Sequence, residues 1–448
     1  MRSGITRQAL RRHRWSLFGT ACTQALGAGV ISVMVMTARS IDRSTLSAEE
    51  HAALRMAGIP ETTTVFIGIS IYLSIVIVGV TMGLAVSRQL RDIALLRIIG
   101  ATPGQVRRSI ALQATVVAVP ATLVGWLAAV PAGALWVGAM RTHGLVPQAV
   151  RFLPDPVAAP IALGIELGAS VLGASVAAIR TSRLAPRLAL TEVARGRRRI
   201  GRLRIGLGVL LVVGGVGLSV VLSGFVPDQA ADAAVFIMLA ECIGVGLLGP
   251  LMLRFVAAGL RPALTDGLPR VAVDDLATMT RSLSGALVPL VLAAAFAVVK
   301  IAGHTTSAHV AGVPDPSADL WIDYFGTGVY SGFAAVAALT CFVTVVAGRR
   351  RDLAALQLAG ATRRDLARIL WAQTLIISAT ALVLAAAVAG ATLVPILHAE
   401  LGRWLPYVPA SVVAAGVLVV GGVVAAGMVV PATCMTRRPP TEVVEVAA

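Results

Sequence analysis

Apolar residues recur along this chain in long runs, and short segments that carry several arginines separate the runs. A helix that crosses the hydrocarbon of a bilayer needs roughly 20 apolar residues, and these runs reach that length. The pattern therefore predicts an all-α integral membrane protein with about ten transmembrane helices. The predicted spans are residues 15–38, 64–86, 110–139, 156–179, 205–225, 233–253, 284–301, 329–347, 369–397 and 409–432.

Composition indicates that lipid is the main solvent of the chain. Hydrophobic residues make up 57% of the 448 positions and charged residues 13%. The mean hydropathy is +0.85, outside the balance that is typical of a soluble globular protein. The first apolar run follows an arginine-rich N-terminus, is longer than a signal-peptide core and lacks a small-residue cleavage site. We expect it to be retained as the first span.

The distribution of arginine predicts the orientation, because cytoplasmic loops retain an excess of Lys and Arg. With the N-terminus inside, most arginines fall in the inner segments. The outer loops keep only Arg39, Arg43, Arg55, Arg141, Arg151 and Arg403. We therefore expect a multi-pass protein of a cell membrane, bacterial in origin, with both termini in the cytoplasm.

The net charge of +16 does not indicate nucleic-acid binding. The basic residues sit in short loops beside apolar spans and lack the interleaved aromatic residues of a nucleic-acid surface. We expect these loops to contact membrane lipids, not nucleic acid.

Two segments of the chain repeat one another at a constant offset of 260. Residues 91–102 read RDIALLRIIGAT, and residues 351–362 read RDLAALQLAGAT. An even number of predicted spans separates the copies, so both should face the same compartment. The predicted organisation is a four-span repeat over 1–204, two linking spans over 205–265 and a second, parallel four-span repeat over 266–448.

Each repeated segment has the pattern of a short amphipathic helix. Ile93, Leu96 and Ile99 are predicted to share one face, and the sequence Gly-Ala-Thr is predicted to end the helix with a turn. Such a pair would fit a soluble partner with two equivalent clefts. An interfacial helix that lies on the membrane surface is the alternative.

The first repeated segment, followed by Gln105, Arg107 and Arg108 and a long apolar run, resembles the FtsX-like permease signature R-E-I-A-L-L-R-A-L-G-A-T. Residues 186–195 resemble the ending of the same domain. The resemblance implies the permease subunit of a MacB-type ABC transporter, in which the segment between the second and third spans of each repeat couples to a separate ATPase subunit, two copies in all. The implied coupling residues are Arg91, Asp92, Ile93, Leu95, Leu96, Arg97, Gly100, Ala101, Thr102, Arg351, Asp352, Leu353, Leu356, Gln357, Gly360, Ala361 and Thr362.

The chain departs from the family pattern in two ways. Asp92 and Asp352 replace the usual Glu, and Gln357 replaces the usual Arg, which implies unequal contacts with two identical ATPase subunits. The ten-span arrangement is similar to that of bacitracin-export permeases, but residues 302–328 are too few for the large extracellular domain that those proteins carry between spans seven and eight.

Motifs for catalysis are missing from the sequence. A Walker A motif needs a lysine after its glycines, and the single lysine, Lys300, is followed by Ile301. The glycines of 244–249 lie within an apolar span and are predicted to pack helices. The four cysteines and six histidines show no metal-binding spacing and no nucleophile-base pattern. We expect no enzyme activity and no cofactor or metal in this chain, with ATP and Mg²⁺ bound by the partner ATPase; a hidden intramembrane hydrolase is the alternative.

Three ionisable residues lie close to the predicted hydrocarbon region: Glu166, Glu241 and Lys300. Charges at that depth are costly, so they are candidates for the substrate pathway. The alternatives are hydrogen bonding between helices and snorkelling toward the headgroups.

Three functions remain open from the sequence. The first is ATP-driven export, or extraction from the membrane, of an amphipathic compound such as an antimicrobial peptide, an antibiotic or a lipid. The second is mechanical control of an extracellular partner such as a cell-wall hydrolase, which the short outer loops disfavour. The third is ion-coupled secondary transport, which should show more buried acidic residues.

Overall fold

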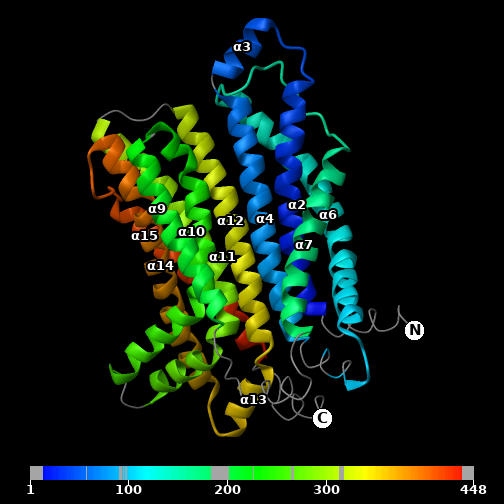
Figure 1. The fold of residues 1–448 in the computed structure, drawn as a ribbon, viewed down its shortest axis with the longest axis vertical. Helices are drawn as coiled ribbons and strands as arrows, with labels where there is room; N and C mark the ends of the chain where they lie inside the picture. Colours follow the sequence, from blue (N-terminus) through cyan, green and yellow to red (C-terminus); the bar gives the residue numbers. More distant parts are fainter. Residues whose placement is uncertain are drawn as a thin grey trace. The chain divides into compact units, whose positions relative to one another are not determined.

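The computed structural model describes residues 14–56, 58–89, 93, 95, 98–182, 201–225, 227–263, 267–311 and 317–435, and most of these residues are helical. Strands are absent from these residues, and Figure 1 shows long helices joined by short connections. The helices are α2 (Arg14–Asp42), α3 (Ala48–Met56), α4 (Ile59–Arg88), α6 (Pro103–Thr142), α7 (Ala158–Ser182), α9 (Arg202–Phe225), α10 (Pro227–Leu260), the 3-10 helix η1 (Arg261–Ala263), α11 (Leu268–Ala311), α12 (Ser317–Ala347), α13 (Arg350–Leu358), α14 (Arg363–Leu401) and α15 (Ala410–Met435).

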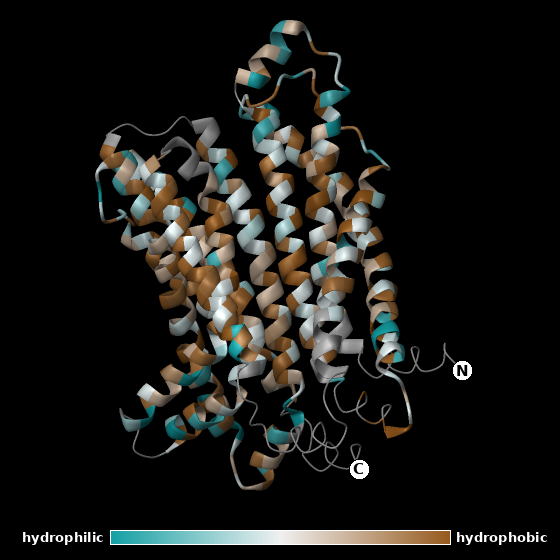
Figure 2. Cartoon of the chain, viewed as in Figure 1, coloured by the Kyte–Doolittle hydropathy of each residue, from teal (hydrophilic) through white to brown (hydrophobic). Residues whose placement is uncertain are grey.

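Each of the ten predicted spans coincides with one long helix. In the described parts of the chain, nine helices are long and apolar enough to cross a membrane, and α7 carries a shorter apolar stretch, Ala158–Gly173. Apolar residues cover most of the helices in Figure 2. The predicted class, an all-α integral membrane protein, is confirmed.

Several helices extend well beyond the predicted spans. Helix α6 has 40 residues, α11 has 44 and α14 has 39. Hydropathy identifies only the part of a helix that is buried in lipid or protein. The helix itself extends as far as its backbone N–H and C=O groups remain hydrogen-bonded to one another. Residues 302–328, predicted as a loop, are mostly helical for this reason, because α11 continues to Ala311 and α12 begins at Ser317.

The chain forms two compact units. Unit 1 comprises Met1–Ala194 with Pro316–Phe333, and unit 2 comprises Arg195–Asp315 with Ala334–Ala448. Helix α12 therefore contributes its first part to unit 1 and the remainder to unit 2. Each unit has its own packing, described separately below.

In unit 1, α2 packs against α4, α6 and α7, and glycines allow close approach. A Cβ atom added to Gly125 of α6 would lie 2.2 Å from the carbonyl oxygen of Ala25 in α2. One added to Gly173 of α7 would lie 2.5 Å from the Cα of Gly79 in α4. Small residues at such crossings let helix backbones pack closely in a membrane, where the hydrophobic effect does not hold helices together.

In unit 2, α10 packs against α9, α11 and α14, and α14 also packs against α11 and α15. A Cβ on Gly244 of α10 would lie 2.9 Å from the carbonyl oxygen of Gly208 in α9. The predicted packing role of the 244–249 glycines is thus confirmed. Pro250 lacks the N–H that would bond the Gly246 carbonyl, and the Arg204 guanidinium donates to that oxygen at 3.3 Å.

Candidate functional site: the repeated segments

The second repeated segment is a short helix with a glycine stop. Helix α13 covers Arg350–Leu358, and Gly360 follows with φ 98°. The Gly360 N–H donates to the Gln357 carbonyl and the Ala361 N–H to the Leu356 carbonyl, both at 3.0 Å. This pair of bonds is a Schellman motif, in which a left-handed glycine ends the helix without a Cβ penalty. Gly360 and Ala361 therefore serve to stop α13.

The threonine of the motif begins the next helix. The Thr362 hydroxyl accepts from the Asp365 N–H at 3.2 Å, and the Asp365 carboxylate accepts from the Thr362 N–H at 3.0 Å. This reciprocal capping box satisfies two N–H groups at the start of α14. The predicted turn at Gly-Ala-Thr is confirmed, with a physical role for each of its three residues.

The first repeated segment shows the same arrangement where the structure describes it. The Ile93 N–H donates to the Gln89 carbonyl at 2.9 Å, and the Ile99 N–H donates to the Leu95 carbonyl at 3.1 Å. Gly100 has φ 102°. Thr102 forms a capping box with Gln105 at the start of α6. Arg91, Asp92, Leu96 and Arg97, like the ending 186–195, lie outside the described residues.

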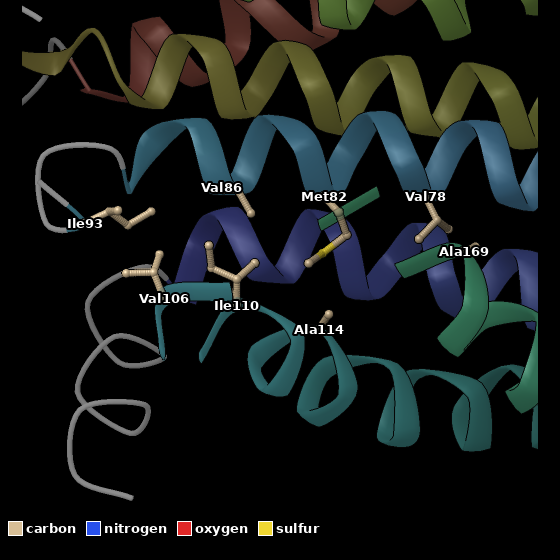
Figure 3. Close-up of a cluster of buried hydrophobic side chains, with 8 residues drawn as sticks. All are labelled: Val78, Met82, Val86, Ile93, Val106, Ile110, Ala114 and Ala169. Carbon is tan, nitrogen blue, oxygen red and sulfur yellow. The ribbon is translucent and has the colours of Figure 1, made fainter. Parts of the chain in front are cut away.

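One residue of each segment is anchored in the protein interior. Ile93 is 6% exposed and belongs to a cluster with side chains of α4, α6 and α7 (Figure 3). Leu353, at the equivalent position of the second segment, is 4% exposed. Ala101 packs against the cluster around Ile93. The cluster consists of Val78, Met82, Val86, Ile93, Val106, Ile110, Ala114 and Ala169.

Other apolar residues of the segments point to the outside of the molecule. Ile98 is 55% exposed and its equivalent Leu358 is 59% exposed. Neither residue was among the coupling residues predicted from the sequence. The predicted shared face was wrong, because Ile93 is buried whereas Ile99 is 84% exposed. Ile99 is the residue just before Gly100, whose positive φ turns the chain at the end of the segment. Each segment thus has a buried anchor and an exposed apolar tip.

The comparison with known families agrees with this duplication. A family model described as FtsX-like permease C-terminal matches residues 64–186 and 325–440, just over half of the chain. The chain belongs to the FtsX-like permease family. Each matched part of this FtsX-like permease contains one repeated segment. A search of curated proteins found no significant match.

A polar tie in unit 2 of the FtsX-like permease holds the start of α13. Arg349, which directly precedes α13, forms an ion pair with Asp275 of α11. The same carboxylate accepts from Gln373 Nε2 of α14 at 2.7 Å. Arg349 is buried and the Asp275 side chain is 25% exposed. Glutamine occurs at positions 113 and 373, at the offset of 260 that relates the two repeated segments, and this recurrence is a sequence feature that marks the tie.

The three intramembrane candidates of the FtsX-like permease have different surroundings. Glu241 of α10 is buried in unit 2, where its Oε2 accepts from the Thr392 hydroxyl of α14 at 2.9 Å. Lys300 lies in α11 of the same unit and is half-buried. Glu166 of α7 is buried in unit 1. The bond to Thr392 fits the expectation of hydrogen bonding between helices for Glu241.

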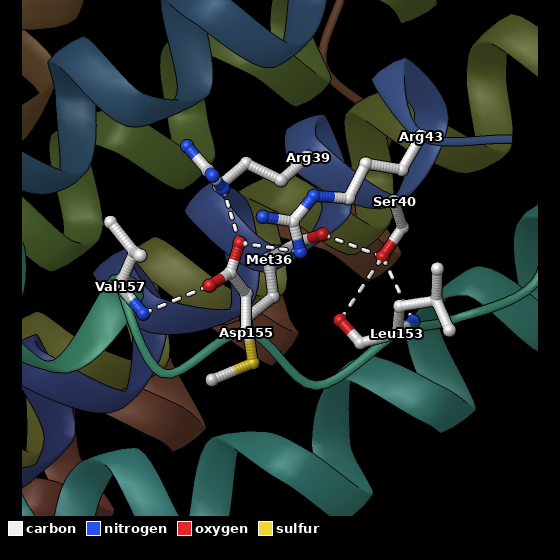
Figure 4. A network of polar contacts seen from close by, with 7 residues as sticks. All are labelled: Met36, Arg39, Ser40, Arg43, Leu153, Asp155 and Val157. Carbon is white, nitrogen blue, oxygen red and sulfur yellow. Dashed lines mark hydrogen bonds and ion pairs between the residues drawn. The ribbon is translucent and has the colours of Figure 1, made fainter.

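Two arginines of the predicted outer loops share one buried carboxylate in unit 1 (Figure 4). Asp155 pairs with Arg39 and, at 3.1 Å, with Arg43. Its Oδ1 accepts from the Val157 N–H at 2.9 Å. This backbone bond, with the help of the two arginines, holds the pKa of Asp155 below its ordinary value. The carboxylate therefore offsets one of the two positive charges, and the group keeps a net charge of +1.

Proposed function

We propose that this FtsX-like permease is the membrane subunit of a MacB-type ABC transporter, and that each repeated segment contacts one copy of an ATPase subunit in the cytoplasm. The main support is the recurrence of one arrangement at an offset of 260: a buried anchor, an exposed apolar tip, a left-handed glycine and a capping box. A helix that only lay on the membrane surface would have no need for these four features, nor for their repetition at a fixed offset.

The arrangement suits the transmission of force. The capping boxes at Thr102 and Thr362 connect each segment directly to a long helix, α6 or α14. Displacement of an exposed tip would therefore move the start of that helix. Ile93 connects the first segment to α4 and α7 as well, while Arg349 connects the second to α11. A rigid short helix that is anchored in this way can deliver motion because packed side chains do not deform continuously.

The cargo in this proposal is an amphipathic compound such as an antimicrobial peptide, an antibiotic or a lipid, which is exported or extracted from the membrane. ATP and Mg²⁺ would bind to the partner subunit, and this chain would contribute helices and no reaction chemistry. Both termini would be cytoplasmic in a bacterial cell membrane, as the distribution of arginine suggests.

Affinity purification of the tagged full chain from its native membrane tests the proposal. We expect a stoichiometric ATPase to accompany the wild type and to be lost from the double variant Ile98→Asp, Leu358→Asp, because a charge at each tip would be desolvated in the contact. Leu405→Asp is the matched control: Leu405 is 82% exposed and follows the far end of α14. Retention of the ATPase by the double variant would place the contact elsewhere.

One observation favours the alternative of mechanical control. The connection between α2 and α4 forms the helix α3, on which Met56 is 90% exposed. If the chain acts on an extracellular partner, α3 offers a surface for it. A strain that lacks the protein separates the two: increased sensitivity to an amphipathic antibiotic supports export, and a defect in cell-wall turnover without it supports control.

A further inference from the structure

The carboxyl group of Glu166 lies against bare backbone in the interior of unit 1. Glu166 is 0% exposed, and a Cβ added to Gly27 of α2 would lie 2.5 Å from its Oε1. The same added atom would lie 2.5 Å from the Ser74 hydroxyl of α4 and 3.3 Å from the Phe333 ring of α12. Four helices of unit 1 thus enclose this carboxyl group.

Several buried polar atoms around the Glu166 carboxyl group have no hydrogen-bond partner. Within the described part of the chain, neither carboxylate oxygen of Glu166 has a hydrogen-bond partner, and the same is true of the Ser74 hydroxyl and of Gln24 Oε1. Gln24 donates its Nε2 to the hydroxyl of Ser170, one turn further along α7. Among the described residues, the site therefore offers this carboxyl group neutral polar atoms such as the Ser74 hydroxyl and no cationic donor.

No described neighbour supplies a positive charge to this position. Gly27 and Gln24 face it from α2, Ser74 from α4 and Phe333 from α12. Tyr330, the titratable residue nearest in sequence to Phe333, already donates its hydroxyl to the Phe66 carbonyl at 2.9 Å.

Charged residues of the packed helices lie toward the helix ends. They include Arg39 and Asp42 of α2, Glu61 of α4, Arg107, Arg108 and Arg141 of α6 and Asp323 of α12. An ionised Glu166 would therefore be buried without hydration and without a counter-charge.

We propose that Glu166 is a proton-binding site, neutral while α2, α4 and α7 are packed together and able to release its proton when they separate. The bound proton removes the buried charge, and the neutral acid can donate its O–H to a neighbouring acceptor such as the Ser74 hydroxyl oxygen. A metal cation is a poorer occupant, because no group of three or more His, Cys, Asp or Glu side chains that could hold one is found among the described residues.

The release step is a simple transfer of a proton. When the helices separate, the O–H bond of the acid breaks, a water molecule that enters accepts the proton, and a hydrated carboxylate remains. Repacking of the helices reverses the transfer. The opening of unit 1 thus releases a proton, and higher pH favours the open form by linkage. This inference goes beyond the proposed function and does not depend on an ATPase partner.

Infrared spectroscopy of the full chain in lipid nanodiscs tests the proposal. At neutral pH we expect the wild type to show the carbonyl stretch of a neutral carboxylic acid, shifted by exchange into deuterated water. We expect Glu166→Gln to lose the part of that band that Glu166 contributes and Glu61→Gln, at an exposed position of α4, to keep the whole band. A wild-type spectrum that equals the Glu166→Gln spectrum in this region would overturn the proposal.

A measurement on the wild type alone covers the case in which Glu166→Gln fails to fold. An apolar carbodiimide modifies neutral carboxylic acids in an apolar environment, and mass spectrometry identifies the modified peptide. We expect modification of Glu166 at neutral pH that declines as the pH is raised. Modification of other acidic residues without Glu166, or modification of Glu166 that does not change with pH, would refute the proposal.

Discussion

The crossing of α2 and α6 makes a quantitative prediction for Gly125→Ala. The added methyl group would lie 2.2 Å from the Ala25 carbonyl oxygen and 3.0 Å from the Gly29 nitrogen, where ordinary contact begins at 3.4 Å. Both neighbouring atoms belong to the backbone, so the two helices would have to move apart by about 1 Å. Overpacking of this kind costs about 1–3 kcal/mol.

Gly138→Ala on the same helix is the matched control. Its added methyl group would meet only the Arg141 guanidinium, at 4.0 Å. Both substitutions gain the helix propensity of alanine, about 1 kcal/mol, and this gain cancels when the two variants are compared. The expected difference in the free energy of unfolding is therefore the overpacking cost itself, about 1–3 kcal/mol, with Gly125→Ala the less stable.

The measurement is unfolding of the purified full chain in mixed micelles by titration with sodium dodecyl sulfate, followed by circular dichroism. Gly138→Ala should unfold at or above the wild-type midpoint, and Gly125→Ala at a midpoint clearly below that of Gly138→Ala. Equal midpoints for the two variants would show that α2 and α6 do not approach at Gly125 as closely as the structure has them.

Two further predictions concern charged groups. Arg349→Gln introduces the residue found at the equivalent position 89 and should destabilise unit 2. A double-mutant cycle with Asp275→Asn should give a coupling energy of about 1–2 kcal/mol, because both side chains are at least partly buried. Strictly additive effects of the two substitutions would disprove the ion pair. For Asp155 the pKa is lower in the folded protein than in the unfolded chain, so its contribution to stability is present above the ordinary value of 3.8 and is lost as the pH falls through the lowered pKa. The melting temperature of the wild type should therefore fall more steeply on acidification than that of Asp155→Asn. Parallel plots of melting temperature against pH for the two proteins would contradict the lowered pKa of Asp155.

The predictions from the sequence were confirmed where a feature depends only on residues that are close together in the chain. The Gly-Ala-Thr stop depends on a glycine that can adopt a positive φ and on a threonine three residues before a capping partner, all within six positions of the chain. The membrane spans are similarly local, since about 20 consecutive apolar residues suffice to identify one. The family resemblance rested on the same short segments.

Tertiary structure decided which residues of those elements meet. Amphipathic spacing placed Ile93 and Ile99 on one face, but only the packing of α4, α6 and α7 determines that Ile93 is the anchor and Ile99 is exposed. The tie between Arg349 and Asp275 joins positions 74 residues apart, and no local pattern marks such a pair.

The same division applies to Glu166. By itself the sequence determined that an acidic residue lies at membrane depth, because depth follows from position within an apolar run. Only the folded unit determined that Gly27, Ser74 and Phe333 enclose its carboxyl group without supplying a positive charge. The physical reason is that hydropathy is a sum over neighbours in the chain, whereas hydrogen bonding and burial depend on neighbours in space.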